Sequence, residues 1–201
     1  MAAEATQAAR LRIVGLDLDV WPAFVDLLGP ERGGDGGCWC TWWRIGRSAW
    51  RACSRDERRA LLEAACRAGE PLGVLALEGE RALGWCAVAP RPAYPTIARS
   101  RVARPDAATP EGSATWFISC FYVRVGHRRR GLTRTLVAGA VRYAATHGAR
   151  CVEACPSLAQ GPGADRFVGA VGTFEACGFV EVARRSPGRP LMRLDLEAGA
   201  P

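Results

Sequence analysis

Residues 116–125 (WFISCFYVRV) are the most strand-like part of the chain, and residues 126–131 (GHRRRG) follow them directly. Aromatic and β-branched residues fill the first stretch, which predicts a buried strand. Apolar residues then recur on one helical face over residues 132–147, and Gly148 provides a stop signal. The stretch therefore predicts a strand, a short arginine- and glycine-rich loop and a helix.

Further strands and helices are predicted on both sides of this unit. Ser54 and Glu57 have the spacing of a helix capping box. Residues 1–10 are expected to be a flexible tail, and residues 11–197 a single α+β domain with one central sheet. The other predicted strands cover 11–14, 72–78, 81–89, 150–154, 179–184 and 191–196, the other helices cover 19–28, 55–68 and 166–177, and the long loops cover 90–113 and 156–164.

The junction between the predicted strand and helix suits an anion. The first amides of a helix have no partner inside the helix, and they lie at its positive end. Gly131 lets a phosphate approach the backbone closely, and Thr133 can add a hydroxyl donor. Neither a Walker loop nor a complete dinucleotide fingerprint is present. The alternative is an ordinary strand-to-helix turn with solvated arginines. The positive charge at this junction would come from Arg128, Arg129, Arg130 and Arg134.

Residues 123–133 (VRVGHRRRGLT) resemble the acyl-CoA signature of the GNAT superfamily of N-acetyltransferases. Arg128 and Gly131 match that signature, whereas Thr133 stands where the family usually has glycine or alanine. Residues 173–179 (TFEACGF) are similar to a second family segment near the C-terminus, of the form L-Y-E-x-x-G-F. The resemblance is specific over 116–196 and only topological over 11–90. It implies a mostly antiparallel mixed sheet, flanked by helices, with two splayed central strands.

The resemblance also implies acetyl-CoA as co-substrate and the primary amine of an acceptor as nucleophile, with direct transfer between them. Backbone groups on the strand would pair with the pantetheine arm, and amides at the helix start would hold the pyrophosphate. The expected cofactor-binding residues are Phe121, Tyr122, Val123, Arg128, Arg129, Arg130, Gly131, Leu132, Thr133 and Arg134.

Glu153 is the candidate catalytic base, because its place on a strand matches a base-bearing strand in some family members. The alternatives are an ion pair with an arginine and a carboxylate at a strand edge. The tyrosine that usually serves as general acid is absent, since Phe174 stands at its position, and Phe167 falls near a frequent family asparagine. Water, Tyr122, Ser119 or Cys155 could supply the proton instead.

The densest aromatic segment is Cys38-Trp39-Cys40-Thr41-Trp42-Trp43. Trp39, Trp42 and Trp43, with Trp50 further on, are predicted to form an aromatic wall for the acceptor, and packing in the core is the alternative. A C-x-C spacing is too short for a common zinc site, so no metal is expected. A reactive Cys38 or Cys40 is left open.

The composition favours a globular domain. The 201 residues carry a net charge of +7, and all 27 basic residues are arginine. Acidic residues are interspersed with the arginines, which disfavours a nucleic-acid stripe. No apolar run reaches the ~18 residues of a membrane span. Without a signal sequence, a cytoplasmic location and free cysteines are expected. A homodimer stays open, as do a peptide acceptor, a non-catalytic acyl-CoA-binding module and an arginine-rich nucleic-acid binder.

Overall fold

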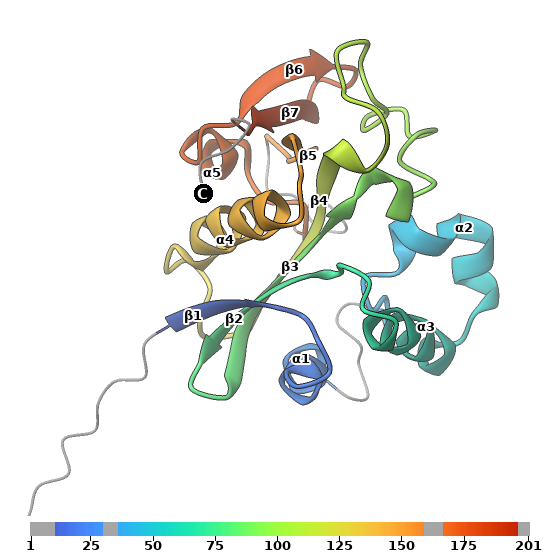
Figure 1. Ribbon diagram of the computed structural model, residues 1–201, viewed down its shortest axis with the longest axis vertical. Helices are drawn as coiled ribbons and strands as arrows, with labels where there is room; N and C mark the ends of the chain where they lie inside the picture. Colours follow the sequence, from blue (N-terminus) through green and yellow to red (C-terminus); the bar gives the residue numbers. More distant parts are fainter. Residues whose placement is uncertain (1–10, 30–35, 159–166, 197–201) are drawn as a thin grey trace, which may run out of the picture.

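The computed structural model describes residues 11–29, 36–158 and 167–196. They form one seven-stranded sheet in the order β1-β2-β3-β4-β5-β7-β6 (Figure 1). Neighbouring strands are antiparallel except β4 and β5, which are parallel. The strands are β1 (Leu11–Gly15), β2 (Gly73–Glu78), β3 (Arg81–Pro90), β4 (Thr115–Val123), β5 (Cys151–Ala154), β6 (Val180–Arg184) and β7 (Pro190–Asp195).

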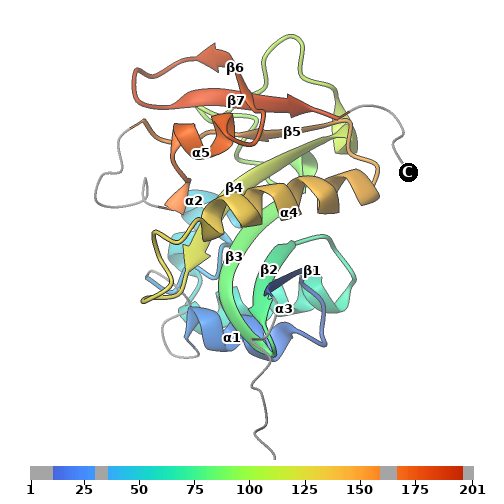
Figure 2. The same ribbon diagram turned by 90° about the vertical axis from the view of Figure 1, so that its left-hand side faces the viewer.

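Helices cover both faces of the sheet (Figure 2). On one face α4 crosses β2, β3 and β4, and α5 lies against its start. On the other face α1 packs on β3, beside α3, and α2 lies next to them (Figure 1). The helices are α1 (Trp21–Leu28), α2 (Trp42–Ala52), α3 (Arg55–Arg67), α4 (Leu132–Thr146) and α5 (Val171–Glu175), and two 3-10 turns cover Arg91–Ala93 and Gly112–Ala114.

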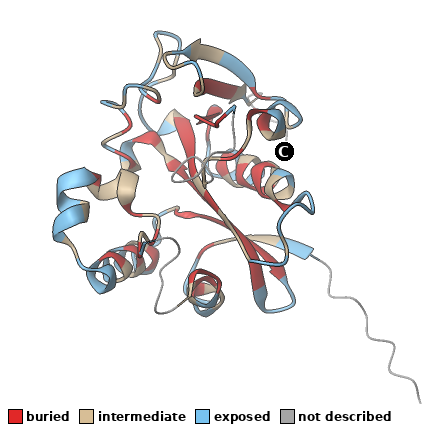
Figure 3. Cartoon of the chain, turned by 180° about the vertical axis from the view of Figure 1, so that it is seen from behind, coloured by how far each residue is buried: buried red, intermediate tan, exposed pale blue. Residues whose placement is uncertain are grey.

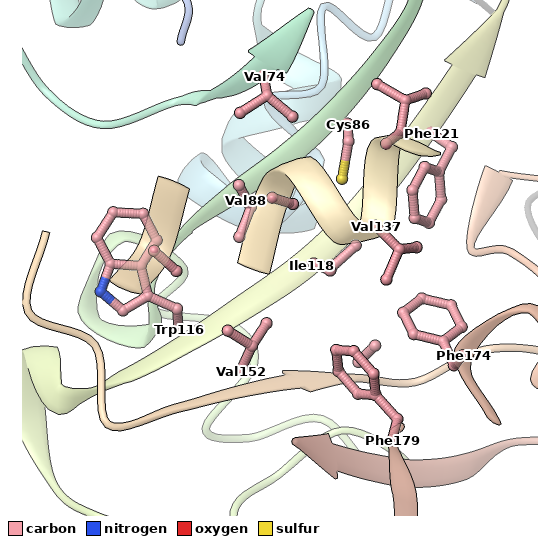
Figure 4. Packing of buried hydrophobic residues seen from close by; sticks show 14 of the residues in the cluster. Val74, Cys86, Val88, Trp116, Ile118, Phe121, Val137, Val152, Phe174 and Phe179 are labelled. Atoms are coloured by element: carbon pink, nitrogen blue, oxygen red, sulfur yellow. The ribbon is translucent and has the colours of Figure 1, made fainter. Parts of the chain in front are cut away.

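The sheet separates two main hydrophobic layers, and the buried residues concentrate on its central strands (Figure 3). On the α4 face, Val137 of α4 packs against the strands, and Phe121, Phe174 and Phe179 gather beside it (Figure 4). On the opposite face, Trp85 of β3 contacts the ring of Phe24 from α1 edge-on, with centroids 4.8 Å apart. The core therefore ties both helical layers to the same strands.

Most predicted elements are confirmed, and the differences concentrate in short segments. The capping box forms at the start of α3, with Ser54 accepting from the Glu57 amide. The aromatic segment leads into α2, a helix that the sequence did not predict because Gly46 interrupts its periodicity with φ +77°. The predicted helix 166–177 is reduced to α5, and its first residue lies outside the described residues, as do the tail 1–10, residue 197 and residues 159–164.

The pairing between β4 and β5 is short. It begins at Thr115 opposite Cys151 and ends at Ile118 opposite Ala154, while β4 continues to Val123 on its β3 side. A β-bulge follows at once, because Ile118 pairs with Val88 and Cys120 pairs with Ala87, which leaves Ser119 as the extra residue. The two central strands therefore part after Ile118, as the resemblance implied.

Candidate active site

A cavity of about 500 Å³ opens between the end of β4, the start of α4 and the segment leading into α5. Nine of the ten predicted cofactor-binding residues line it, all except Arg130. Arg130 lines a neighbouring hollow of about 600 Å³, which shares Arg128 and Arg129 with the cavity. The cavity is lined by Phe121, Tyr122, Val123, His127, Arg128, Arg129, Gly131, Leu132, Thr133, Arg134, Phe167, Gly169, Ala170 and Thr173.

The first turn of α4 presents free backbone amides to this cavity. Gly131 is the N-cap with φ +76°, and Arg129 also has a positive φ of +61°. Within the described part of the chain, the amides of residues 129–133 donate to no protein acceptor, and the first helical bonds begin with the Arg134 amide. A Cβ on Gly131 would meet nothing within 4 Å. The helix start is therefore open, which is the arrangement that binds phosphate groups.

Arginine side chains add positive charge around the same turn. Arg128, Arg129, Arg130 and Arg134 are exposed, and no described acidic side chain forms an ion pair with them. Arg128 donates from Nε to the Val123 carbonyl oxygen at 3.2 Å, which holds its side chain beside the end of β4. Charge and free amides thus meet at one end of the cavity.

The end of β4 also has an unused hydrogen-bonding edge. Tyr122 and Val123 pair with β3 on one side, whereas β5 stops pairing at Ile118 on the other. An extended chain that carries amide groups can therefore add to β4 from the β5 side. Such a chain would lead from the start of α4 back toward the point where the two strands part.

Glu153 lies outside this cavity in a buried ion-pair network. Its side chain is 0% exposed. Arg91 donates from Nε to Oε2 at 2.7 Å, and Arg193 donates from Nε to Oε1 at 2.9 Å. Thr109 adds its hydroxyl to Oε1 at 3.0 Å. Both carboxylate oxygens are thus occupied by donors, so the geometry favours the ion-pair alternative over the predicted catalytic base.

The network extends beyond Glu153 to a second carboxylate. Arg193 donates to Asp106 at 2.6 Å. Burial by itself would lower the pKa of Arg193. The hydrogen bonds to Asp106 and Glu153 outweigh this effect, so the pKa of Arg193 is raised. The same contact, with help from Thr109, lowers the pKa of Asp106 despite its partial burial. The network fastens the loop between β3 and β4 to β5 and β7.

Phe174 has no chemical role of the kind that a tyrosine could play there. Its ring is fully buried, 6.0 Å from Phe121 and 5.1 Å from Phe179 by centroid (Figure 4). The side chain completes the hydrophobic layer behind the cavity. Phe167, at the position of the frequent family asparagine, lines the cavity itself.

The predicted aromatic wall divides between core and surface. Trp39 is only 1% exposed and packs against Phe24, so the core alternative applies to it. Trp42 is half-buried and meets Trp50 edge-on at 5.3 Å. Trp43 is half-buried too, and it packs against the cluster around Tyr94. None of the three predicted tryptophans lines the cavity.

A cysteine environment near the bulge was not predicted. Trp85 donates from its indole N–H to the Cys40 sulfur at 3.3 Å. The Cys120 thiol has two acceptors in reach, the Cys40 sulfur and the Phe121 carbonyl oxygen at 3.7 Å. The Cys120 contact, together with Trp85 and Arg44, lowers the pKa of Cys40 against the effect of burial. The sequence offered only the C-x-C spacing, which carries no information about a partner 80 residues away.

In the described ranges, no group of three or more histidine, cysteine or acidic side chains could hold a metal ion. No helix among them is both long and apolar enough to cross a membrane.

Comparisons with known proteins identify the family. The family described as "Acetyltransferase (GNAT) family" matches residues 39–179. No curated protein matches the sequence. One similar structure is yncA, described as a proposed acetyltransferase, from Salmonella typhimurium with its cofactor acetyl-CoA, at 18% identity and TM-score 0.52, covering 95% of this chain and 96% of that one.

Two further structures share the fold at low identity. The PaiA N-acetyltransferase from Thermoplasma acidophilum, in complex with coenzyme A, has 9% identity and TM-score 0.52, covering 93% of this chain and 99% of that one. The ribosomal-protein-alanine N-acetyltransferase from Brucella melitensis has 17% identity and TM-score 0.51, with coverage of 92% and 99%. With the family match over residues 39–179, the chain belongs to the GNAT acetyltransferase family and is an N-acetyltransferase.

Proposed function

We propose that this enzyme binds acetyl-CoA in the cavity at the start of α4 and transfers the acetyl group directly to the primary amine of a small molecule. The observation that carries the proposal is the set of free amides at residues 129–133, which faces a cavity of about 500 Å³ and is ringed by arginines. Two of the similar structures were solved with acetyl-CoA or coenzyme A.

The residues fit such a co-substrate in three ways. The amides around Gly131 and the neighbouring arginines suit a pyrophosphate. The free edge of β4 at Phe121, Tyr122 and Val123 suits the amide groups of a pantetheine arm. The parting of β4 and β5 after Ile118 leaves a route for the thioester end toward the opposite face of the sheet.

The proposed acceptor is a small amine because of what covers that opposite face. Residues 38–52 and helix α3 lie beside it (Figure 1), and Trp42 and Trp50 of α2 pack edge-on against each other there. A closed site suits a small acceptor, whereas a peptide needs an open groove. A peptide acceptor is the alternative, since the Brucella neighbour is by its description a ribosomal-protein-alanine N-acetyltransferase.

The chemistry requires an unprotonated amine, which attacks the thioester carbonyl carbon as the carbon–sulfur bond breaks. Both carboxylate oxygens of Glu153 accept hydrogen bonds within the ion-pair network, so we assign no catalytic base. A cytoplasmic location and a homodimer remain predictions from the sequence.

Two measurements test the proposal. Isothermal titration of the full chain with acetyl-CoA should show binding, and an amine library should reveal acceptors through release of the CoA thiol. Absence of acetyl-CoA binding would overturn the proposal outright. Binding of acetyl-CoA without turnover across the small amines of the library would overturn the proposed acceptor class. Comparing peptides with small amines in the same assay decides between the two classes of acceptor.

A further inference from the structure

Two buried hydroxyl groups lack a hydrogen-bond partner at the point where the central strands part. Tyr94 is 1% exposed and Ser119 is 4% exposed. Neither Tyr94 Oη nor Ser119 Oγ makes a hydrogen bond to any described residue. Most buried polar side chains are hydrogen-bonded, so two orphaned hydroxyls side by side require an explanation.

The bulge determines where the Ser119 hydroxyl lies. Ser119 follows Ile118, the last residue of β4 that pairs with β5, and it is the extra residue opposite β3. It therefore stands at the apex of the gap between the two strands. Phe121, two residues further along β4, already lines the cofactor cavity.

Tyr94 covers the same apex from the face opposite α4. It belongs to the buried cluster that contains Phe117 of β4 and Cys155, the residue after the end of β5. Its ring meets Phe117 edge-on at 6.5 Å between centroids. The Ser119 hydroxyl lies close enough to Tyr94 Oη to lower the pKa of Tyr94, although the two oxygens do not form a hydrogen bond of normal geometry. Tyr94 and Ser119 thus bring their hydroxyls together from different elements.

We propose that the hydroxyls of Tyr94 and Ser119 donate hydrogen bonds to the carbonyl oxygen of the bound thioester. The inference rests on the proposed function, because the reactive end of a co-substrate that follows β4 from the start of α4 reaches this apex. The thioester oxygen gains negative charge when the amine attacks, and fixed donors in a buried site stabilise that charge. The bound thioester would also supply the partner that both hydroxyls lack.

The hydroxyls keep their protons in this role. Burial is the main influence on Tyr94 and raises its pKa, while the neighbouring Arg44 guanidinium and Ser119 oppose it. A tyrosine that resists ionisation is a hydrogen-bond donor rather than a proton source. In the step itself the nitrogen–carbon bond forms, the carbon–sulfur bond breaks and CoA leaves as the thiolate, while the amine proton passes to solvent.

Infrared difference spectroscopy with acetyl-CoA labelled by ¹³C at the thioester carbonyl tests the donors without knowledge of the acceptor. Bound to the wild-type enzyme, the carbonyl band should lie at lower frequency than in free acetyl-CoA. Tyr94→Phe should move the band back toward the free value. Tyr143→Phe on α4 is the matched control, because it deletes the same hydroxyl away from the gap and should leave the band unchanged.

Turnover and stability provide the second test, with the best amine from the library as acceptor. Tyr94→Phe should lower kcat about 10²- to 10³-fold, as loss of one oxyanion donor does, and leave the Kd for acetyl-CoA unchanged. The melting temperature should not fall, because the variant removes an unpartnered hydroxyl. Ser119→Ala should act in the same direction.

The outcomes separate this inference from the proposed function. If the wild-type enzyme fails to bind acetyl-CoA, the proposed function fails and the inference fails with it. If it binds and turns over normally but Tyr94→Phe changes neither the carbonyl band nor kcat, only the inference is overturned. A parallel fall of kcat, acetyl-CoA affinity and melting temperature would assign Tyr94 a structural role and would also overturn it.

Discussion

Replacing Glu153 with glutamine removes a buried negative charge and keeps the shape of the side chain. In the variant, Arg91 loses its described carboxylate partner and keeps the Ala103 carbonyl oxygen and the Phe117 ring. Arg193 retains Asp106. The substitution therefore leaves the buried guanidinium of Arg91, but not that of Arg193, without a carboxylate partner.

The size of the effect follows from that count. Removing one partner of a buried ion pair costs about 3–5 kcal/mol, because the other charge stays buried without compensation. In a domain of this size 1 kcal/mol shifts the melting temperature by about 2–4 °C, so Glu153→Gln should lower it by about 6–20 °C. Thermal unfolding followed by circular dichroism measures the change. Glu181→Gln is the control, since Glu181 pairs with Arg184 on the surface and should change the melting temperature little.

The same variant decides between the two interpretations of Glu153. If Glu153 is a catalytic base, the variant should lose turnover and keep its melting temperature. If Glu153 is a member of the ion-pair network, the variant should have a lower melting temperature. Its turnover per folded molecule should then change far less than it does when a base is removed. An unchanged melting temperature combined with a fall in kcat of about 10²-fold or more would refute the structural reasoning.

Three further predictions concern the cavity, the cysteines and α3. Gly131→Val should weaken acetyl-CoA binding by calorimetry, because a branched side chain strains φ +76° and occupies the anion site, whereas Gly148→Val strains φ +78° away from the cavity and should not. Cys40 should react with iodoacetamide at lower pH than Cys177 in peptide mapping, because its Cys120 contact lowers its pKa while burial raises that of Cys177. The N-cap amide of α3 lowers the pKa of Glu57, so the stabilisation that the Glu57 carboxylate contributes is present above its unfolded pKa and is lost as pH falls through its folded pKa. In Glu57→Gln, the free energy of unfolding should therefore fall less steeply as the pH is lowered.

The part of the site made by local sequence was predictable. The amides at the start of α4 follow from a strand, a glycine and a helix in succession, whereas residues 121–123 were expected only from the resemblance to the family. Both groups of residues line the cavity. Contacts between side chains that are distant in the sequence could not be predicted. Glu153 meets Arg91 across 62 positions and Arg193 across 40, and 27 arginines offered no means of choosing between them.

Tyr94 escaped prediction altogether, and Ser119 was predicted only as a possible proton donor. Alternation along β4 fails at Ser119, because the bulge adds a residue that no periodic pattern marks. Tyr94 lies in the loop between β3 and β4, where the sequence has no periodicity at all. Trp39 was predicted to line an acceptor site and is instead buried in the core, because an aromatic cluster in the sequence is equally compatible with both places.

The ion-pair network and the proposed oxyanion donors share one segment of chain. The 3-10 turn Arg91–Ala93 is closed by the Tyr94 amide, which donates to the Arg91 carbonyl oxygen at 2.9 Å. The guanidinium of Arg91 is in turn fixed by Glu153. A carboxylate on β5 thereby helps to hold the Tyr94 ring at the gap. Because the effects of two residues that act through one another are not additive, the double variant of Glu153→Gln and Tyr94→Phe should lose less kcat than the product of the single losses. Multiplicative losses in kcat would show that the network and Tyr94 act independently.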